Sequence, residues 1–295
     1  RSADGQSALE RSIAVLPLEN RSNDVDQEFF ADGMTEQLIT DLSKIRALRV
    51  ISRSSVIRYR GTKKPLPEVA ADPGVDALVV ASVMRSADKV RIAAQLIEGR
   101  GDRNLWAESY DRQLSEVLAL QREVARSIAN EIRITITPAE QTQLSSNRAV
   151  DPEVHDLVLR AQYFANKGSE ASLKQGLSYI DQALAKNAEY APAYAIAAFI
   201  YGGLSTVHAP PREVMPKAKA AAEKALQLDE TIPDAHISLA GVLLFYDWDW
   251  PEAEKHLKRG LELNPSSANG HVLYANYFGA QGRDEEALAE LRLAQ

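Results

Sequence analysis

The chain has 295 residues, of which 45% are hydrophobic and 25% are charged, as is ordinary for soluble globular domains. It contains no cysteine, which excludes thiolate catalysis, zinc–thiolate sites and disulfides. The net charge is −7, and no stretch approaches the roughly 18 consecutive apolar residues of a membrane span. The length suggests two domains.

The charge is unevenly distributed. Residues 1–150 hold 21 basic and 21 acidic residues, whereas residues 151–295 hold 13 basic and 20 acidic residues. An acidic second half argues against nucleic-acid binding there, because phosphates must be met by positive charge. Between Lys44 and Lys64, however, there are eight basic residues and no acidic one. This segment is either a solvated strand edge and loop or a patch for an anion or partner, for which the candidates are Arg49, Arg53, Arg58 and Arg60.

The pattern of the first part of the chain predicts alternating strands and helices. Residues 1–11 are polar, without the apolar core of a secretion signal, and are expected to be a linker. A compact strand–helix–strand unit follows, which predicts parallel strands joined by a crossover. In chain order we expect a strand at 13–18, a polar loop at 19–27, a helix at about 30–45 and a strand at 48–52.

The hydrophobic period then changes to two, which is typical of half-buried strands. We expect at most a short helix in 65–76, strands at 77–84, 89–96 and 105–110, and a second main helix capped by Ser115. The sequence thus predicts an α/β domain over residues 12–135, with a mixed sheet of about five strands and two main helices. Residues 136–152 lose this periodicity and are interpreted as a domain junction.

The second half is internally repetitive. The segments "APAYAIAAFIYG", "PDAHISLAGVLLF" and "ANGHVLYANYFGA" align on a small residue that follows a ring by four positions. A second set aligns on Ala183, Ala225 and Gly260, at spacings of 42 and 35 residues. We interpret the longer spacing as a unit near 34 residues with an eight-residue insertion at or near "LSTVHAPP". The rings are Tyr194, His236 and His271, and the small residues are Ala198, Ala240 and Ala275.

This pattern resembles the tetratricopeptide (TPR) repeat, and "GHVLYANYFGAQGRDEEALAELRLA" at 270–294 carries the likeness most closely. The resemblance implies an all-α solenoid over residues 153–295, with about 3.5 to 4 repeats, and a natural protein that continues further. It also implies a concave side that binds a protein or peptide. Residues projected onto that side are Phe199, Ile237, Gly241, Leu244, Phe245, Val272, Asn276 and Ala280. Either a partner covers them, or the first domain or further repeats pack there. In "YDWDW", Trp248 and Trp250 are interpreted as packing residues, with a binding platform as the alternative.

The first part resembles the TolB amino-terminal-like domain, through "SIAVLPLENRSNDVDQEFFADGMTEQLITDLSKIRALRVISRSSV" and "RSADKVRIAAQLIEGRGDRNLWAESYDR". In bacterial membrane-anchored signalling proteins this domain commonly precedes TPR repeats. The effectors there are winged-helix regulators, adenylate cyclases or protein kinases. The resemblance implies a periplasmic module that follows a membrane helix, with a cytoplasmic location as the alternative.

Catalytic signatures are missing from the sequence. The stretch "QEFFADGMTEQLITDLSKIRALRVISRS" has one glycine, Gly33, and no Lys-Ser/Thr pair, so it is neither a P-loop nor a dinucleotide fingerprint. Asp32 and Glu36 share a helix face and are interpreted as complements to the helix dipole. The five histidines form no H-x-x-x-H pair. We therefore expect no enzyme activity, no catalytic residue, no cofactor and no metal.

The function expected from the sequence is a non-catalytic sensory and protein-interaction module of a membrane-anchored bacterial signalling or transcription-regulatory protein. Its TPR groove would bind a protein or peptide partner, and an oligomer is compatible with this. No nucleic acid is expected to bind, and a membrane would be reached only through a helix upstream of residue 1. The alternatives are a cytosolic TPR adaptor, or the regulatory portion of an adenylate cyclase or kinase whose catalytic domain lies elsewhere.

Overall fold

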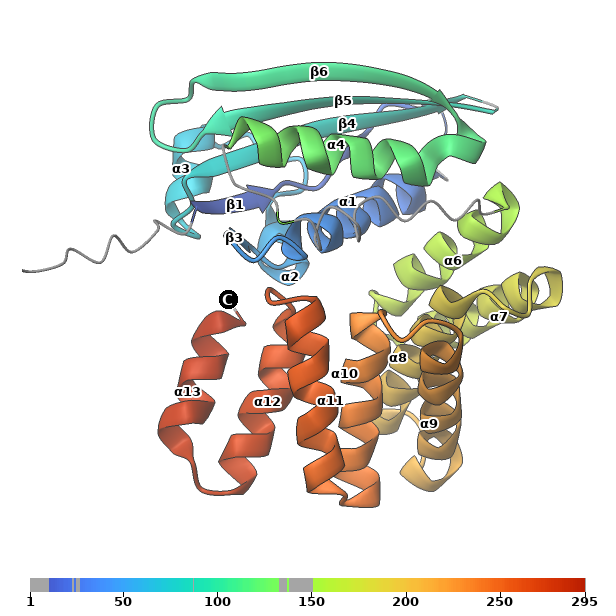
Figure 1. Ribbon diagram of the computed structural model, residues 1–295. Coiled ribbons are helices and arrows are strands. Elements are labelled where there is room, and N and C mark those ends of the chain that lie inside the picture. The colour runs from blue at the N-terminus through green and yellow to red at the C-terminus, as the bar shows by residue number, and fades with distance from the viewer. Residues whose placement is uncertain are drawn as a thin grey trace, which may run out of the picture.

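The computed structural model describes residues 11–22, 24, 27–86, 88–132, 137 and 151–294. A twisted sheet with helices on it comes first, and a row of helical hairpins follows (Figure 1). The sequence predicted this order of a mixed sheet and then helices, and the prediction is confirmed. The expected linker, except for Arg11, and nearly all of the expected junction lie outside the described residues.

The sheet is mixed and has six strands in the order β3-β1-β4-β5-β6, with β2 paired to β4 off this path. Strand β1 runs parallel to β3 and to β4, whereas β4, β5 and β6 pair antiparallel. The parallel pair β1 and β3 confirms the predicted strand–helix–strand unit. The strands are β1 (Arg11–Val15), β2 (Glu19–Asn20), β3 (Leu48–Val50), β4 (Ala77–Ser86), β5 (Lys89–Glu98) and β6 (Asn104–Gln113).

The strand β2 lies in a segment that was predicted to be a polar loop. Pro17 has no N–H to donate to a ladder, and the strand β1 ends just before it, at Val15. The chain then rejoins the sheet, where Glu19 lies opposite Ser82 of β4. A strand of two residues is too short to show a hydrophobic period in the sequence. The strand β2 exists only because it pairs with β4.

Helices α1 and α4 lie on one face of the sheet (Figure 1) and bury their apolar faces in its core. Ser115 was predicted to cap the second main helix, and this is wrong. Instead, a capping box joins Gln113 and Glu116 around a short 3-10 turn, and α4 follows directly. The helices of this part are α1 (Glu28–Ser43), α2 (Arg53–Val56), α3 (Leu66–Ala71) and α4 (Val117–Glu131).

The remaining helices form hairpins in chain order, α6 with α7, α8 with α9, α10 with α11, and α12 with α13 (Figure 1). Helices α8 and α9 have 17 and 18 residues, against 14 and 13 in α11 and α12. The insertion predicted near "LSTVHAPP" therefore lengthens two helices. The bounds are α6 (Pro152–Ala165), α7 (Glu170–Lys186), α8 (Ala191–Val207), α9 (Pro211–Leu228), α10 (Pro233–Val242), α11 (Trp250–Leu263), α12 (Ala268–Ala280) and α13 (Asp284–Leu293).

Small residues sit where these helices cross, as their repeated positions predicted. Ala183, Ala225 and Ala240 are fully buried. At the matching position of α11, a β-carbon on Gly260 would lie 2.5 Å from Ile237 Cδ1. Close approach of the helix backbones is therefore what selects alanine or glycine at these positions.

The aligned rings have a common structural role. The Tyr194 hydroxyl donates to the Ala188 carbonyl at 3.1 Å. In the next two hairpins, His236 Nε2 lies 3.0 Å from the Glu230 carbonyl and His271 Nε2 lies 2.9 Å from the Pro265 carbonyl. Each ring reaches a carbonyl six residues earlier, in the loop that enters its helix. The rings thus pack between helices and also hold these loops.

Helix α6 belongs to both halves of the molecule. Its Leu159 packs in the core under the sheet, whereas its Val154 and Val158 pack in the core of the hairpins. The Arg160 guanidinium lies 3.9 Å from the centroid of the Phe29 ring on α1. Helix α6 therefore fixes the position of the hairpins against α1.

Candidate binding site between the two halves

A cavity of about 1500 Å³ lies between α1 and α4 of the first part and the hairpin helices α6, α8, α10 and α12. We call it the interdomain cavity. Glu36, Gln37 and Thr40 of α1 line one side of it, and side chains of α8, α10 and α12 line the other. A second contact joins the halves elsewhere, where the Val50 N–H donates to Ser266 Oγ at 3.4 Å. The side of the hairpins formed by α8, α10 and α12 therefore faces the first domain across the cavity.

Most residues predicted to line the TPR groove are found at this cavity. Phe199, Phe245 and Val272 retain 37%, 53% and 40% of their surface exposed, although they are apolar. Ile237 and Gly241 also line the cavity. The other three do not line it: Leu244 is buried inside the hairpins, and Asn276 and Ala280 are exposed farther along α12.

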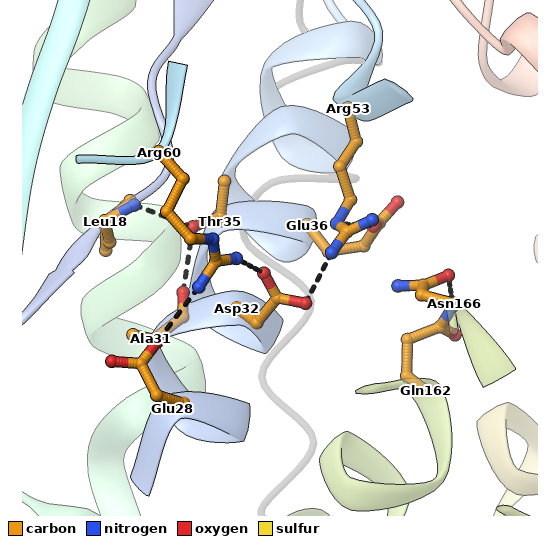
Figure 2. Close-up of polar contacts among 10 residues, drawn as sticks. All are labelled: Leu18, Glu28, Ala31, Asp32, Thr35, Glu36, Arg53, Arg60, Gln162 and Asn166. Carbon is orange, nitrogen blue, oxygen red and sulfur yellow. Dashed lines mark hydrogen bonds and ion pairs between the residues drawn. The ribbon is translucent and has the colours of Figure 1, made fainter. Parts of the chain in front are cut away.

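Beside the cavity, the carboxylates of α1 pair with arginines from the basic segment (Figure 2). Asp32 is only 4% exposed, lies 2.5 Å from Arg53 Nη2 and also pairs with Arg60. Glu36 Oε2 lies 3.1 Å from Arg53 Nε, and Glu28 Oε2 lies 2.9 Å from Arg60 Nη1. The interpretation that Asp32 and Glu36 complement the helix dipole is wrong, because α1 begins at Glu28 and both lie beyond its first turn.

The candidate anion patch is largely neutralised within the chain. Besides Arg53 and Arg60, Arg58 pairs with Asp72 at 3.0 Å. Arg49 is exposed and donates to the Gly74 carbonyl at 3.3 Å. The basic segment contains the edge strand β3, as one of its two interpretations expected. The expected loop instead forms α2 and a 3-10 turn, from which Arg53 and Arg60 reach back to α1. Anion binding at these residues stays a prediction.

Two carboxyl groups at the cavity have perturbed acidity. Burial between the halves raises the pKa of Glu36 to about 7, against the attraction of Arg53 and with added repulsion from Asp234. Burial also raises the pKa of Asp234, while the charge of Lys44 opposes this. The Glu36 side chain is still 32% exposed, because it faces the cavity while protein atoms surround it at longer range. These carboxyls therefore sit in a poorly solvated space that is open to a ligand.

His155 is a deeply buried polar side chain on the cavity wall. It is 5% exposed, and neither ring nitrogen has a hydrogen-bond partner. Burial, with a smaller contribution from the charge of Arg85, lowers its pKa to about 4. The ring is therefore neutral at pH 7, with one donor and one acceptor. The sequence did not single out this residue, because it belongs to no metal-binding pair and is not one of the aligned repeat rings.

The loop between α10 and α11 holds the two tryptophans that were predicted to be packing residues, Trp248 and Trp250. The prediction is wrong for Trp248. The chain passes through a π-helical turn, Leu243–Asp247, and Trp248 then adopts a left-handed backbone with φ of 61°. Trp248 is 70% exposed, with its ring centroid 6.3 Å from that of Trp250. Only Trp250 is partly buried against the hairpin core.

Two absences hold for the part of the chain that the structure describes. There, no group of three or more histidine, aspartate or glutamate side chains is placed to hold a metal ion. None of the described helices is both long and apolar enough for a bilayer crossing.

Comparison with known proteins identifies a sequence relative. No family model matches the chain. Over 231 residues it is 36% identical to "Putative adenylate cyclase 3" of Rhizobium meliloti (strain 1021). The match covers 78% of this chain but 39% of that protein, so the chain spans about two fifths of the relative's length.

Among solved structures, similar chains include TPR proteins and a lipoprotein. The thermophilic TPR protein TTC0263 of Thermus thermophilus is 17% identical with a TM-score of 0.41, covering 61% of this chain and 86% of that one. YrrB, described as a TPR protein with an unusual peptide-binding site, is 22% identical with a TM-score of 0.35 over 53% and 72%. Lipoprotein GNA1162 of Neisseria meningitidis is 22% identical with a TM-score of 0.31 over 43% and 99%.

Proposed function

We propose that this chain is a non-catalytic sensory and protein-interaction module that binds a protein or peptide segment in the interdomain cavity. The observation that carries the proposal is the cavity itself, with Phe199, Phe245 and Val272 exposed along one side of it. Its volume of about 1500 Å³ exceeds the roughly 300–1,000 Å³ of small-molecule pockets. A polypeptide segment with apolar side chains fits such a space better than a metabolite.

The module is proposed to regulate an effector elsewhere in a longer signalling protein. The R. meliloti relative is named as an adenylate cyclase, and the likeness to it leaves three fifths of that protein unmatched. We therefore favour the regulatory portion of an adenylate cyclase, ahead of a winged-helix regulator, a kinase or a free adaptor. The TolB-like sequence of residues 12–135 supports a periplasmic position after a membrane helix.

Peptide selection tests the binding proposal. Phage-displayed random 12-residue peptides would be selected on the intact chain, and individual peptides would be measured by fluorescence polarisation. We expect Phe199→Ser with Phe245→Ser to weaken binding about tenfold or more, because apolar contact area is lost. The control is Leu105→Ser on β6, whose side chain is 39% exposed and does not line the cavity. Failure to enrich any peptide, or equal binding by all three proteins, would contradict the proposal.

The regulatory context needs the full-length protein. An alkaline phosphatase fusion after residue 294 should be active in cells if the module is exported, and inactive if it stays in the cytoplasm. In a full-length cyclase, Phe199→Ser with Phe245→Ser should change cyclic AMP production while Leu105→Ser leaves it as it was. If the variant with both phenylalanines replaced produces as much cyclic AMP as the native protein, regulation through this site is excluded.

A further inference from the structure

Two carboxyl groups approach the interdomain cavity from different halves of the molecule. Glu36 comes from the middle of α1, and Asp234 comes from the first turn of α10. They are near enough for the charge of Asp234 to raise the pKa of Glu36. The molecule thus brings two acidic groups together across a poorly solvated space, where like charges repel each other more strongly than in water.

The cavity wall carries fewer cations than acids, because Lys44 and Arg122 line it against Glu36, Glu189, Asp229 and Asp234. Arg53, the partner of Glu36, is shared with Asp32, and Asp32 shares Arg60 with Glu28. Three carboxylates therefore share two guanidinium groups, which leaves one negative charge without a matching positive charge.

Asp234 is no better matched than Glu36. The Lys44 ammonium is the cation whose charge reaches Asp234, but it donates to Asp41 at 2.7 Å. Among the described residues, no ion pair joins Asp234 to a basic side chain. A cation from outside the chain would restore the balance.

His155 adds an unpartnered polar side chain beside this cavity. Its ring lies on the wall of the same cavity, 5% exposed, with both nitrogens unpartnered. Leaving such buried polar atoms unpaired destabilises a fold. Both nitrogens are shielded from solvent, so a peptide group could pair with them only if the side chains around the ring moved aside.

We propose that the occupant is a peptide segment bearing a lysine or arginine, whose cationic head lies between Glu36 and Asp234 while neighbouring apolar side chains lie against Phe199 and Phe245. A divalent metal fits less well, because two carboxyls are too few ligands for such an ion. A free polyamine would satisfy the charge but leave the apolar wall uncovered. This inference rests on the proposed function and specifies the chemistry of the partner.

The test reads the composition of the peptides selected on the intact chain. We expect peptides enriched on the native protein to carry Lys or Arg flanked by Leu, Ile, Val or Phe. Measured by fluorescence polarisation, their binding should weaken about tenfold on Asp234→Asn with Glu36→Gln. The matched control is Asp181→Asn, because Asp181 is exposed on α7 and does not line the cavity. Replacing the basic residue of one selected peptide by citrulline should cause the same loss on the native protein.

The outcomes separate the inference from the proposed function. Peptides that depend on Phe199 and Phe245 but carry no basic residue, or that bind the doubly neutralised variant unchanged, would overturn the charge assignment and leave the groove function standing. Spermine that displaces the peptides and binds equally tightly alone would overturn the peptide assignment. Selection of no groove-dependent peptide would overturn both. Far-ultraviolet circular dichroism and a melting curve confirm that each variant is folded.

Discussion

Gly33 and Leu159 are packed so closely that a β-carbon at Gly33 would lie 2.6 Å from Leu159 Cδ2. The backbone of α1 therefore packs directly against the Leu159 side chain of α6, which would have to shift to admit a β-carbon. From the sequence, Gly33 was considered as a phosphate-loop glycine and that role was rejected. Its role is structural, since it allows the contact that sets the first domain over the hairpins.

The first prediction concerns this contact. Gly33→Ala gains roughly 0.5–1 kcal/mol of helix stability but overpacks the interface at a cost of roughly 1–3 kcal/mol. We expect a net loss of about 1 kcal/mol in urea unfolding. Gly279→Ala is the control, because its β-carbon would meet no atom within 4 Å in α12.

A double-mutant cycle shows whether Leu159 is the cause. In a Leu159→Ala background the collision is gone, so Gly33→Ala should become neutral or stabilising. If Gly33→Ala costs the same free energy in both backgrounds, the contact with Leu159 does not explain the glycine.

The second prediction is a pH dependence that arises from His155. Its pKa is about 4 in the folded chain against 6.5 for the ordinary imidazole. Below pH 6.5 this imidazole is protonated in the unfolded chain but stays neutral in the folded chain. The free energy of unfolding therefore falls as the pH drops toward 4. This difference corresponds to about 3 kcal/mol.

His155→Leu removes this titration. Relative to the native protein, the variant should gain stability steadily between pH 6.5 and pH 4, as measured by urea unfolding at several pH values. A constant difference across this range would show that the ring is protonated in the folded state or reaches solvent.

The third prediction has the opposite sign. The pKa of Glu36 is raised to about 7 from 4.5, so the folded chain binds this proton more tightly than the unfolded chain. The resulting stability is fully present below pH 4.5 and is lost as the pH rises through 7. Glu36→Gln stays neutral, so its stability relative to the native protein should improve from pH 5 to pH 8.

The matched control for Glu36→Gln is Asp181→Asn, which neutralises an exposed carboxylate outside the cavity. Its stability relative to the native protein should change little over the same range. If Glu36→Gln instead loses stability at pH 8, the ion pair with Arg53 outweighs the cost of burying the carboxylate.

The fourth prediction concerns Trp248, whose φ of 61° is left-handed and whose side chain is 70% exposed. A left-handed backbone costs a residue with a β-carbon roughly 1–2 kcal/mol relative to glycine. Trp248→Gly should therefore stabilise the chain by about 1 kcal/mol, despite the greater freedom of the unfolded chain. Trp248→Ala keeps the strain and should not stabilise. Equal melting temperatures for the two variants would mean that the loop relaxes.

Much of the fold was predictable because its causes are local. The alternation Val90, Ile92, Ala94 and Leu96 predicted a half-buried strand, and these side chains are buried in β5. The repeated small residues predicted close helix crossings, and Ala225 and Gly260 occupy them. Glu19–Asn20 and the segment around Arg53 were missed because neither has a period of its own.

The candidate site was predictable on one side only. The repeat pattern projected Phe199, Phe245 and Val272 toward a groove, and they line the cavity. The repeat pattern could not predict that Glu36 of α1 lines the same cavity, because nothing in the hairpin sequence specifies which face of the first domain lies opposite. Nor could it indicate that His155 is unpartnered, since this depends on what surrounds the ring.

The sequence by itself determined the two architectures, because hydrogen-bonded helices and strands and their buried faces follow from residues a few positions apart. Tertiary structure decided which groups meet: Asp32 with Arg53 and Arg60, Gly33 with Leu159, and Glu36 with Asp234 across the cavity. Val50 and Ser266, 216 positions apart, touch between the halves. Such contacts depend on how whole helices and strands pack against one another. The packing depends on the complementary shapes of distant elements, which no short stretch of sequence determines.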